Sequence, residues 1–180
     1  MLDMQNKVAL ITGGASGMGR IIALRLAARG ARVVIFDVNE AGLEATCAEH
    51  ERIHALRCDI GDLDDVEKKV AQVEQETGPI DLLVHAAALM PSHKLVDHTH
   101  AGMERLFRIN YFGTTYIIRS VLPSMLARRS CRIIAFGSVA GYALVTHMGG
   151  YCATKSAVNT YVEILQNELR DSGVQVHLVC

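Results

Sequence analysis

Short apolar segments alternate with longer segments of helical character along the chain. The short segments are apolar on both faces, as in Val-Val-Ile-Phe at 33–36, which is typical of strands in a parallel sheet covered by helices. The predicted strands are Val8–Thr12, Arg32–Asp37, Ile53–Asp59, Ile80–Ala86, Arg132–Ser138 and Val174–Cys180. The predicted helices are Met18–Arg29, Glu40–Glu49, Leu63–Thr77, Met103–Arg129 and Tyr151–Asp171.

This alternation predicts an α/β fold made of βαβ units, in which a doubly wound parallel sheet lies between two helical layers. The chain has 180 residues, half of them hydrophobic, and it shows no internal repeat and no linker. We therefore expect one domain spanning residues 1–180. Pro123 is expected to kink or interrupt the fourth helix, because proline removes a backbone donor.

Composition excludes several classes of partner. The formal net charge is −1, so nothing favours nucleic acid or an anionic membrane electrostatically. The N-terminus has no apolar signal core and no apolar run could span a bilayer, which predicts a cytoplasmic protein without a membrane partner. The five cysteines are scattered and odd in number, as expected in a reducing compartment. His98 and His100 are the closest histidine pair but lack matching ligands nearby, so no metal site is expected.

A glycine-rich turn follows the first predicted strand directly. The sequence Thr-Gly-Gly-Ala-Ser-Gly-Met-Gly at 12–19 lets the backbone approach a ligand closely, and the next helix presents free N–H groups to a pyrophosphate. A Walker loop needs lysine and then serine or threonine after its last glycine, whereas arginine and isoleucine follow here. The residues of the turn expected to contact a dinucleotide are Gly13, Ser16, Gly17, Met18 and Gly19.

An acidic residue, Asp37, ends the second predicted strand, where a dinucleotide fold places its ribose-binding carboxylate. A carboxylate there accepts hydrogen bonds from a ribose diol and repels a 2′-phosphate, and the neighbouring Val38 supplies no positive charge. The sequence therefore favours NAD over NADP. A glycine-rich turn without a ligand is the alternative, and the strand before it, the helix after it and Asp37 disfavour that alternative.

Tyr151 and Lys155 stand four residues apart in the last predicted helix, which places them on one helix face. An ammonium one turn away favours the phenolate form of a tyrosine, so the pair is suited to general acid/base chemistry on a hydroxyl group. Taken alone, the same spacing also fits an ordinary amphipathic surface pair.

Together these residues resemble the short-chain dehydrogenase/reductase family, and the resemblance extends from Val8 to Cys180. Its Thr-Gly-x-x-x-Gly-x-Gly motif matches residues 12–19, and its Tyr-x-x-x-Lys motif matches Tyr151 and Lys155. The resemblance also assigns residues elsewhere in the chain. The catalytic serine and asparagine look like Ser138 and Asn110, the pair meeting the adenine like Asp59 and Ile60, and the residues beside the cofactor like Ala86 and Ala87.

The resemblance implies a Rossmann-type sheet with strand order 3-2-1-4-5-6 and hydride transfer between NAD and a small secondary alcohol or ketone. In that reaction Tyr151 exchanges the hydroxyl proton, and Lys155 holds the nicotinamide ribose and lowers the phenol's pKa. Ser138 positions the substrate oxygen, and Asn110 supports a water-mediated proton route. Tyr151 and Lys155 thus count among the cofactor-binding residues too. The resemblance further implies a homodimer or homotetramer formed through the helices 103–129 and 151–171.

The chain departs from the family in two places. His85 stands where the family usually has asparagine, which we interpret as a tolerated substitution rather than a loss of function. The family also continues past the sixth strand with a substrate-covering segment and a seventh strand, so the chain is expected to be truncated, with an exposed apolar edge strand and an incomplete substrate pocket. The pocket mouth is expected to be mostly apolar. Its residues would be Leu89, Met90, His93, Ala143, Leu144, Val145, His147 and Met148.

Three other functions remain open at this stage. The chain could be a catalytically impaired NAD-binding interaction module, although the Ser138, Tyr151 and Lys155 set argues against a pure binder. It could be an NADP-dependent reductase of the 3-oxoacyl type. A dehydratase or epimerase acting on nucleotide sugars is disfavoured by the short chain and its apolar loop.

Overall fold

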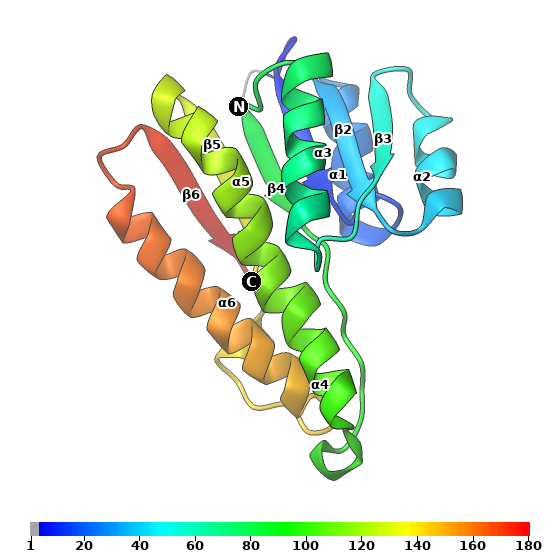
Figure 1. Ribbon diagram of the computed structural model, residues 1–180, viewed down its shortest axis with the longest axis vertical. Helices are drawn as coiled ribbons and strands as arrows, with labels where there is room; N and C mark the ends of the chain where they lie inside the picture. The colour runs from blue at the N-terminus through cyan, green and yellow to red at the C-terminus, as the bar shows by residue number, and fades with distance from the viewer. Residues whose placement is uncertain (1–3) are drawn as a thin grey trace.

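A six-stranded parallel sheet forms the centre of the protein in the computed structural model, which describes residues 4–180 (Figure 1). The strands follow the order β3-β2-β1-β4-β5-β6, which confirms the predicted α/β class and strand order. Their bounds are β1 Val8–Thr12, β2 Arg32–Asp37, β3 Ile53–Arg57, β4 Leu82–His85, β5 Cys131–Phe136 and β6 Val174–Val179.

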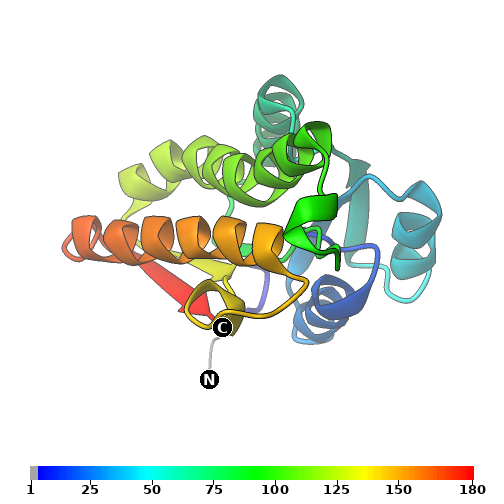
Figure 2. The same ribbon diagram turned by 90° about the horizontal axis from the view of Figure 1, so that it is seen from below.

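Helices cover both faces of the sheet (Figure 2). One apolar layer joins the sheet to α3, α5 and α6, and a second joins it to α1 and α2. Alternate residues of β1 serve the two layers, since Leu10 packs in the first and Ile11 in the second. The helix bounds are α1 Gly17–Ala27, α2 Glu40–Cys47, α3 Leu63–Glu76, α4 His100–Phe107, α5 Gly113–Arg128 and α6 Gly149–Glu168. Short 3-10 turns cover Leu95–Asp97 and Val139–Gly141.

The fourth predicted helix is divided, but not where proline suggested. A π turn at Arg108–Phe112 separates α4 from α5, whereas α5 runs through Pro123 without a break. The prediction of a kink or interruption at Pro123 was therefore wrong as to an interruption. Arg119, whose carbonyl loses its usual partner to Pro123, is an exposed residue, so water can take over that hydrogen bond.

Strand ends differ from the prediction mainly at the carboxyl edge of the sheet. The strands β3, β4 and β5 end one or two residues earlier than expected, so Asp59, Ala86 and Ser138 lie in loops. The last helix, α6, begins at Gly149, two residues before Tyr151. Both differences place the predicted site residues at loop and helix starts rather than within the sheet.

A half-buried carboxylate at the opposite edge joins β1, β4 and α5. Asp81 accepts a hydrogen bond from the Val8 backbone N–H at 2.9 Å and from Arg128 Nη1 at 2.9 Å. We predict that Asp81→Ala lowers the free energy of unfolding by about 2 kcal/mol, because two charge-assisted bonds are lost and a strand N–H is left without its partner. Lys7→Met is the control: its ammonium lies 3.9 Å from Asp81 and is largely exposed, so we expect a change within about 0.5 kcal/mol. Denaturant unfolding measures both, and equal effects would contradict the assignment.

Candidate active site

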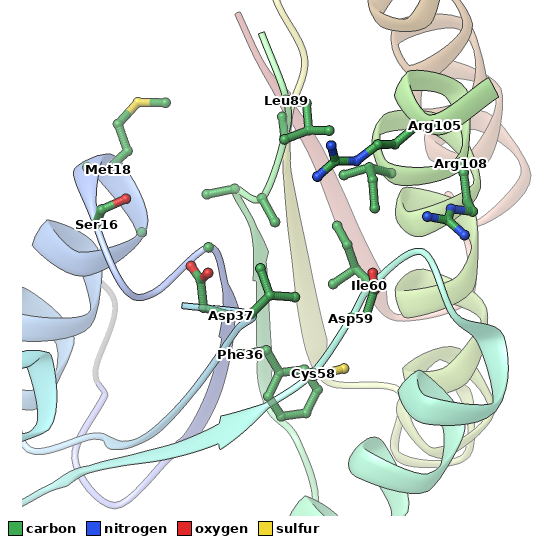
Figure 3. Close-up of a pocket in the computed structure, with 18 residues that line it drawn as sticks. Ser16, Met18, Phe36, Asp37, Cys58, Asp59, Ile60, Leu89, Arg105 and Arg108 are labelled. Carbon is green, nitrogen blue, oxygen red and sulfur yellow. The ribbon is translucent and has the colours of Figure 1, made fainter. Parts of the chain in front are cut away.

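A cleft of about 370 Å³ opens at the carboxyl edge of the sheet, where the strand order reverses between β1 and β4 (Figure 3). Ligands of doubly wound folds bind at such a switch point. The cleft is lined by ten of the residues that the sequence assigned to the cofactor: Gly13, Ser16, Gly17, Met18, Gly19, Asp37, Asp59, Ile60, Ala86 and Ala87. The other two, Tyr151 and Lys155, are not among its lining residues.

The glycine turn is tightly folded against its neighbours. The backbone N–H groups of Gly13 and Gly14 both donate to the Phe36 carbonyl, at 2.8 and 3.2 Å. A Cβ atom at Gly19 would stand 2.2 Å from the Gly13 carbonyl oxygen, and one at Gly13 would stand 2.9 Å from the Ala87 nitrogen. Side chains at these two positions would therefore force the turn open and move it relative to β4.

The start of α1 is open to an anion. Ser16 occupies the N-cap position but its side chain makes no capping hydrogen bond, and the first turn carries no acidic residue. The first N–H groups of this 11-residue helix thus lack side-chain acceptors, while the helix dipole favours negative charge there. These features fit the pyrophosphate of a dinucleotide.

Asp37 lies across from this helix start, with its carboxylate directed toward the glycine turn (Figure 3). Its oxygens accept hydrogen bonds from the N–H of Ala15 at 3.2 Å and of Asn39 at 3.1 Å. Carboxylate lone pairs remain available for a diol. Asp37 therefore fits the ribose-binding role, and the same contacts fix its position relative to the turn.

The cleft is also lined by two arginines that the sequence did not identify. Arg105 and Arg108 extend from α4 and the π turn, and Figure 3 shows both guanidinium groups on the side of the cleft opposite the glycine turn. Only a helix covering this segment was predicted, and its periodicity did not reveal which side chains face a ligand. The other lining residues that were not assigned to the cofactor are Phe36, Val38, Cys58, Ala88, Ile109 and Leu89, the last of which was expected at the substrate pocket instead.

Tyr151 and Lys155 lie one turn apart near the start of α6, and both are buried. The Lys155 Nζ atom is 5.8 Å from the centre of the Tyr151 ring and donates a hydrogen bond to the Phe136 carbonyl at 2.7 Å. Burial lowers the pKa of Lys155 to about 8. The Tyr151 hydroxyl has no hydrogen-bond partner among residues 4–180, so it is free to meet a substrate.

Ser138 follows β5 and is held in place by a residue that the sequence reading missed. Asn159 donates from Nδ2 to the Ser138 carbonyl at 3.0 Å and accepts from the Ser138 N–H at 3.3 Å. The Ser138 hydroxyl oxygen accepts from the Ala140 N–H at 3.1 Å, which leaves its proton free. Asn159 follows Lys155 by four residues, so continuing the spacing of the Tyr151–Lys155 pair by one turn would have found it.

Asn110 lies buried in the π turn and connects the cleft to α6. Its amide donates to the Leu89 carbonyl at 2.9 Å and to Thr154 Oγ1 at 3.0 Å, and it accepts from the Leu89 N–H at 2.8 Å. Leu89 also lines the cleft, and Thr154 directly precedes Lys155. Asn110 therefore fixes the distance between the cofactor cleft and the Tyr151–Lys155 pair.

His85, at the end of β4, is buried and bonded at both ring nitrogens. Nδ1 lies 2.7 Å from Thr12 Oγ1, and Nε2 lies 2.9 Å from Thr114 Oγ1. Burial, and secondarily the charge of Lys155, lower the pKa of His85 to about 3, so the imidazole is neutral at pH 7. The larger ring thus fits in place of the family's asparagine with both of its nitrogens hydrogen-bonded.

The expected substrate-contacting residues fall into two groups. Leu89, Met90 and His93 line a second cavity of about 500 Å³ between the loop after β4 and α4. The loop before α6 does not contribute to that cavity, and Leu144 in this loop is 98% exposed. The two groups nevertheless meet, because the His93 N–H donates a hydrogen bond to the His147 carbonyl at 2.7 Å. The remaining residues of the second group are Ala143, Val145, His147 and Met148.

Residues 4–180 contain neither a metal site nor a membrane-spanning helix. No group of three or more histidine, cysteine or acidic side chains in that range could hold a metal ion. None of the helices described there is long and apolar enough to cross a membrane.

The chain belongs to the short-chain dehydrogenase family, a family of oxidoreductases, because the model of that family, described as short chain dehydrogenase, matches residues 7–180. Among curated relatives, the human epidermal retinol dehydrogenase 2 is 30% identical over 186 residues. The match covers 99% of the chain but only 60% of that relative, so the chain spans about three fifths of its length.

Solved structures agree with this family assignment. A short-chain dehydrogenase/reductase from Burkholderia phymatum in complex with NAD superposes with a TM-score of 0.96 at 29% identity, covering 100% of this chain and 66% of that one. The F189W actinorhodin polyketide ketoreductase with NADPH superposes with a TM-score of 0.94 at 31% identity, covering 100% of this chain and 71% of that one. Similar chains thus bind either form of the cofactor.

The lowered pKa of Lys155 predicts a pH-dependent contribution to stability. Between pH 8 and 10.5 the unfolded chain holds a proton on this amine that the folded chain does not, so the contribution of Lys155 to stability rises with pH in that window. Lys155→Met removes this contribution. The free energy of unfolding of the unsubstituted chain should therefore gain on that of Lys155→Met as pH rises from 7 to 10, measured by urea unfolding.

The exposed residue Lys94 provides the control, since Lys94→Met removes a lysine from a loop surface. We expect the difference from the unsubstituted chain to stay flat over the same pH range. A flat difference for Lys155→Met as well would contradict the effect of burial on its amine.

Proposed function

We propose that the chain is the NAD-binding and catalytic portion of an enzyme that interconverts a secondary alcohol and a ketone, with residues 1–180 forming one domain. The observation that carries this proposal is the buried Tyr151–Lys155 pair, whose hydroxyl has no partner within the described chain. Burying a lysine is costly, and a cleft suited to a dinucleotide is joined to this pair through the Asn110 hydrogen bonds to Leu89 and Thr154. A site for acid/base chemistry on a bound substrate accounts for that cost.

In this reaction the nicotinamide of bound NAD supplies or accepts the hydride. Tyr151 gives its hydroxyl proton to the substrate oxygen during reduction and removes it during oxidation. The Lys155 ammonium, 5.8 Å from the ring centre, stabilises the negative charge that develops on the phenol oxygen. Because Lys155 Nζ reaches the Phe136 carbonyl at the carboxyl end of β5, the edge of the sheet at which the cleft opens, we assign it to the nicotinamide ribose as well.

Ser138 and Asn110 orient the reacting groups. The free proton of Ser138 Oγ can be donated to the substrate oxygen, while its backbone is clamped by Asn159. Asn110 uses its whole amide to hold Leu89 and Thr154, so it acts on the position of α6 relative to the cleft. We retain a role for Asn110 in a proton route behind Lys155 as part of the proposal.

The substrate we favour is a moderately apolar alcohol or ketone. The loops beside the site carry exposed apolar side chains, Met90 and Leu144 among them, and no concentration of positive charge. A human relative named as a retinol dehydrogenase and a similar structure named as a polyketide ketoreductase support this class. A cytoplasmic location and a homodimer or homotetramer formed through α5 and α6 complete the proposal.

Tyr151→Phe tests the acid/base assignment. Removing the hydroxyl should lower kcat about 10²–10⁴-fold, the usual contribution of general acid/base catalysis, while Kd for NADH stays within about threefold. Fluorescence titration gives the Kd, and oxidation of NADH against a panel of ketones gives the rate. Tyr116→Phe is a matched control, because the Tyr116 ring stacks on Phe112 in the α5 region and does not line the cleft. Near-full turnover by Tyr151→Phe would exclude the mechanism, and NADH binding by a chain that turns over no ketone would favour the non-catalytic binding module.

Asp37→Asn tests the choice of NAD over NADP. Asparagine keeps an acceptor for the Ala15 N–H but removes the charge that repels a 2′-phosphate. The ratio of Kd for NADP to Kd for NAD should fall about tenfold or more, since a close like-charge contact is worth at least 1.4 kcal/mol. Glu40→Gln removes a nearby carboxylate that does not line the cleft and should leave the ratio unchanged. An unchanged ratio in Asp37→Asn would favour the NADP-dependent reductase.

A further inference from the structure

We propose that His85 is a positioning residue, which holds the cofactor cleft and the Tyr151–Lys155 pair in a fixed relation through a buried chain of hydrogen bonds. The inference rests on the proposed function, because positioning matters only for a reaction that joins the two places. The hydrogen-bond chain passes through five polar residues, none of which is more than 2% exposed. They are Thr12, His85, Thr114, Asn110 and Thr154.

One end of the hydrogen-bond chain lies at the cofactor cleft. Thr12 ends β1 directly opposite His85 in β4, and it is the first residue of the glycine turn. Its hydroxyl oxygen accepts a hydrogen bond from the Ala87 N–H at 3.3 Å and lies 2.7 Å from His85 Nδ1. Since Ala87 lines the cleft and faces Gly13, this end fixes the spacing between the turn and the loop after β4.

The other end of the hydrogen-bond chain reaches Tyr151. His85 Nε2 lies 2.9 Å from Thr114 Oγ1, whose hydroxyl donates to the Asn110 carbonyl at 2.6 Å. The Asn110 amide donates to Thr154 Oγ1 at 3.0 Å, and that hydroxyl donates to the Tyr151 carbonyl at 2.8 Å. The hydrogen-bond chain thus links the strands, the π turn and α6 directly, without an intervening water.

The direction of these bonds fixes the tautomer of the imidazole. A carbonyl cannot donate, so the Thr114 hydroxyl spends its only proton on Asn110 and must accept from His85 Nε2–H. The neutral ring then has no proton on Nδ1, which accepts from the Thr12 hydroxyl. His85 therefore donates toward the catalytic end and accepts from the cofactor end.

Neither amide side chain can make both bonds. An asparagine oxygen reaches the place of Nδ1 and can accept from Thr12, but it is too short to reach Thr114. A glutamine amide nitrogen reaches the place of Nε2 and can donate to Thr114, but it offers no acceptor to Thr12. His85→Asn and His85→Gln therefore each break the hydrogen-bond chain on one side of residue 85 only.

The first experiment reads the tautomer by ¹H–¹⁵N correlation spectroscopy of the chain with ¹⁵N-labelled histidine, and His85→Asn identifies the His85 signals by their loss. We expect a neutral ring with the proton on Nε2 at pH 7. A proton on Nδ1, or a doubly protonated ring, would overturn the proposal. This measurement needs neither cofactor nor turnover, so it stands or falls apart from the proposed function.

The second experiment compares the two cuts by steady-state kinetics and NAD titration. His85→Asn should lower kcat about tenfold with Kd for NAD within about twofold, because one hydrogen bond on the catalytic side is lost. His85→Gln should raise Kd for NAD about tenfold with kcat at saturation within about threefold. Equal effects of both variants on both quantities would show a merely structural role and overturn the proposal.

A double-mutant cycle tests the link to α5. Thr114→Val should destabilise the unsubstituted chain in thermal unfolding by more than it destabilises His85→Asn, where the bond to residue 85 is already lost and only the bond to the Asn110 carbonyl remains to be removed. Thr115→Val is the control, since its hydroxyl bonds the Phe112 carbonyl at 2.8 Å but does not bond His85. Its effect should be the same in both backgrounds. Full additivity for Thr114→Val would contradict the proposed hydrogen-bond chain, whether or not any substrate is turned over.

Discussion

The shared direction of six strands is the constraint on which the rest of this structure depends. Parallel strands end at one edge of the sheet, so loops that are distant in sequence must meet there. The register pairs Thr12 with His85, which brings the glycine turn beside the loop after β4. Because the crossovers on the two sides of β1 and β4 run to opposite faces, no helix fills the space between them. The cleft occupies that space, and the residues around it owe their proximity to the register of the strands.

Buried polar groups give this site its rigidity. Lys155, Asn110 and Asn159 are all buried, and each is hydrogen-bonded to backbone of another segment. An unpaired group in such a place would cost more than the bond contributes, so each polar residue restricts where its neighbouring segment can lie. The apolar layers hold the helices on the sheet, while these polar contacts decide their position to within a hydrogen-bond length. Stability and placement of the site therefore come from different parts of the same interior.

The sequence predicted the order of the elements well because apolar periodicity reflects burial. It predicted strand ends less well, since Ile60 stays buried in the cleft wall after β3 has ended, so burial continues where strand pairing stops. The π turn was not visible in the sequence from 103 to 129, because it is a change of backbone hydrogen bonding within a segment that is helical on both sides of it. Arg105 and Arg108 escaped notice for a related reason: long polar side chains on a helix are usually solvated, and only the fold shows which ones border a cleft.

The π turn at Arg108–Phe112 also has a consequence for how members of this family are compared. A π turn holds one residue more than the α turn it replaces. Deleting one residue there would allow a continuous α-helix, but would rotate one half by about 100° relative to the other. Thr114 and Asn110 could then no longer face His85 and Leu89 together. A one-residue difference in length at this helix is thus as informative about a relative's active site as a missing tyrosine, although an alignment scored on residue identity would count it as a single gap.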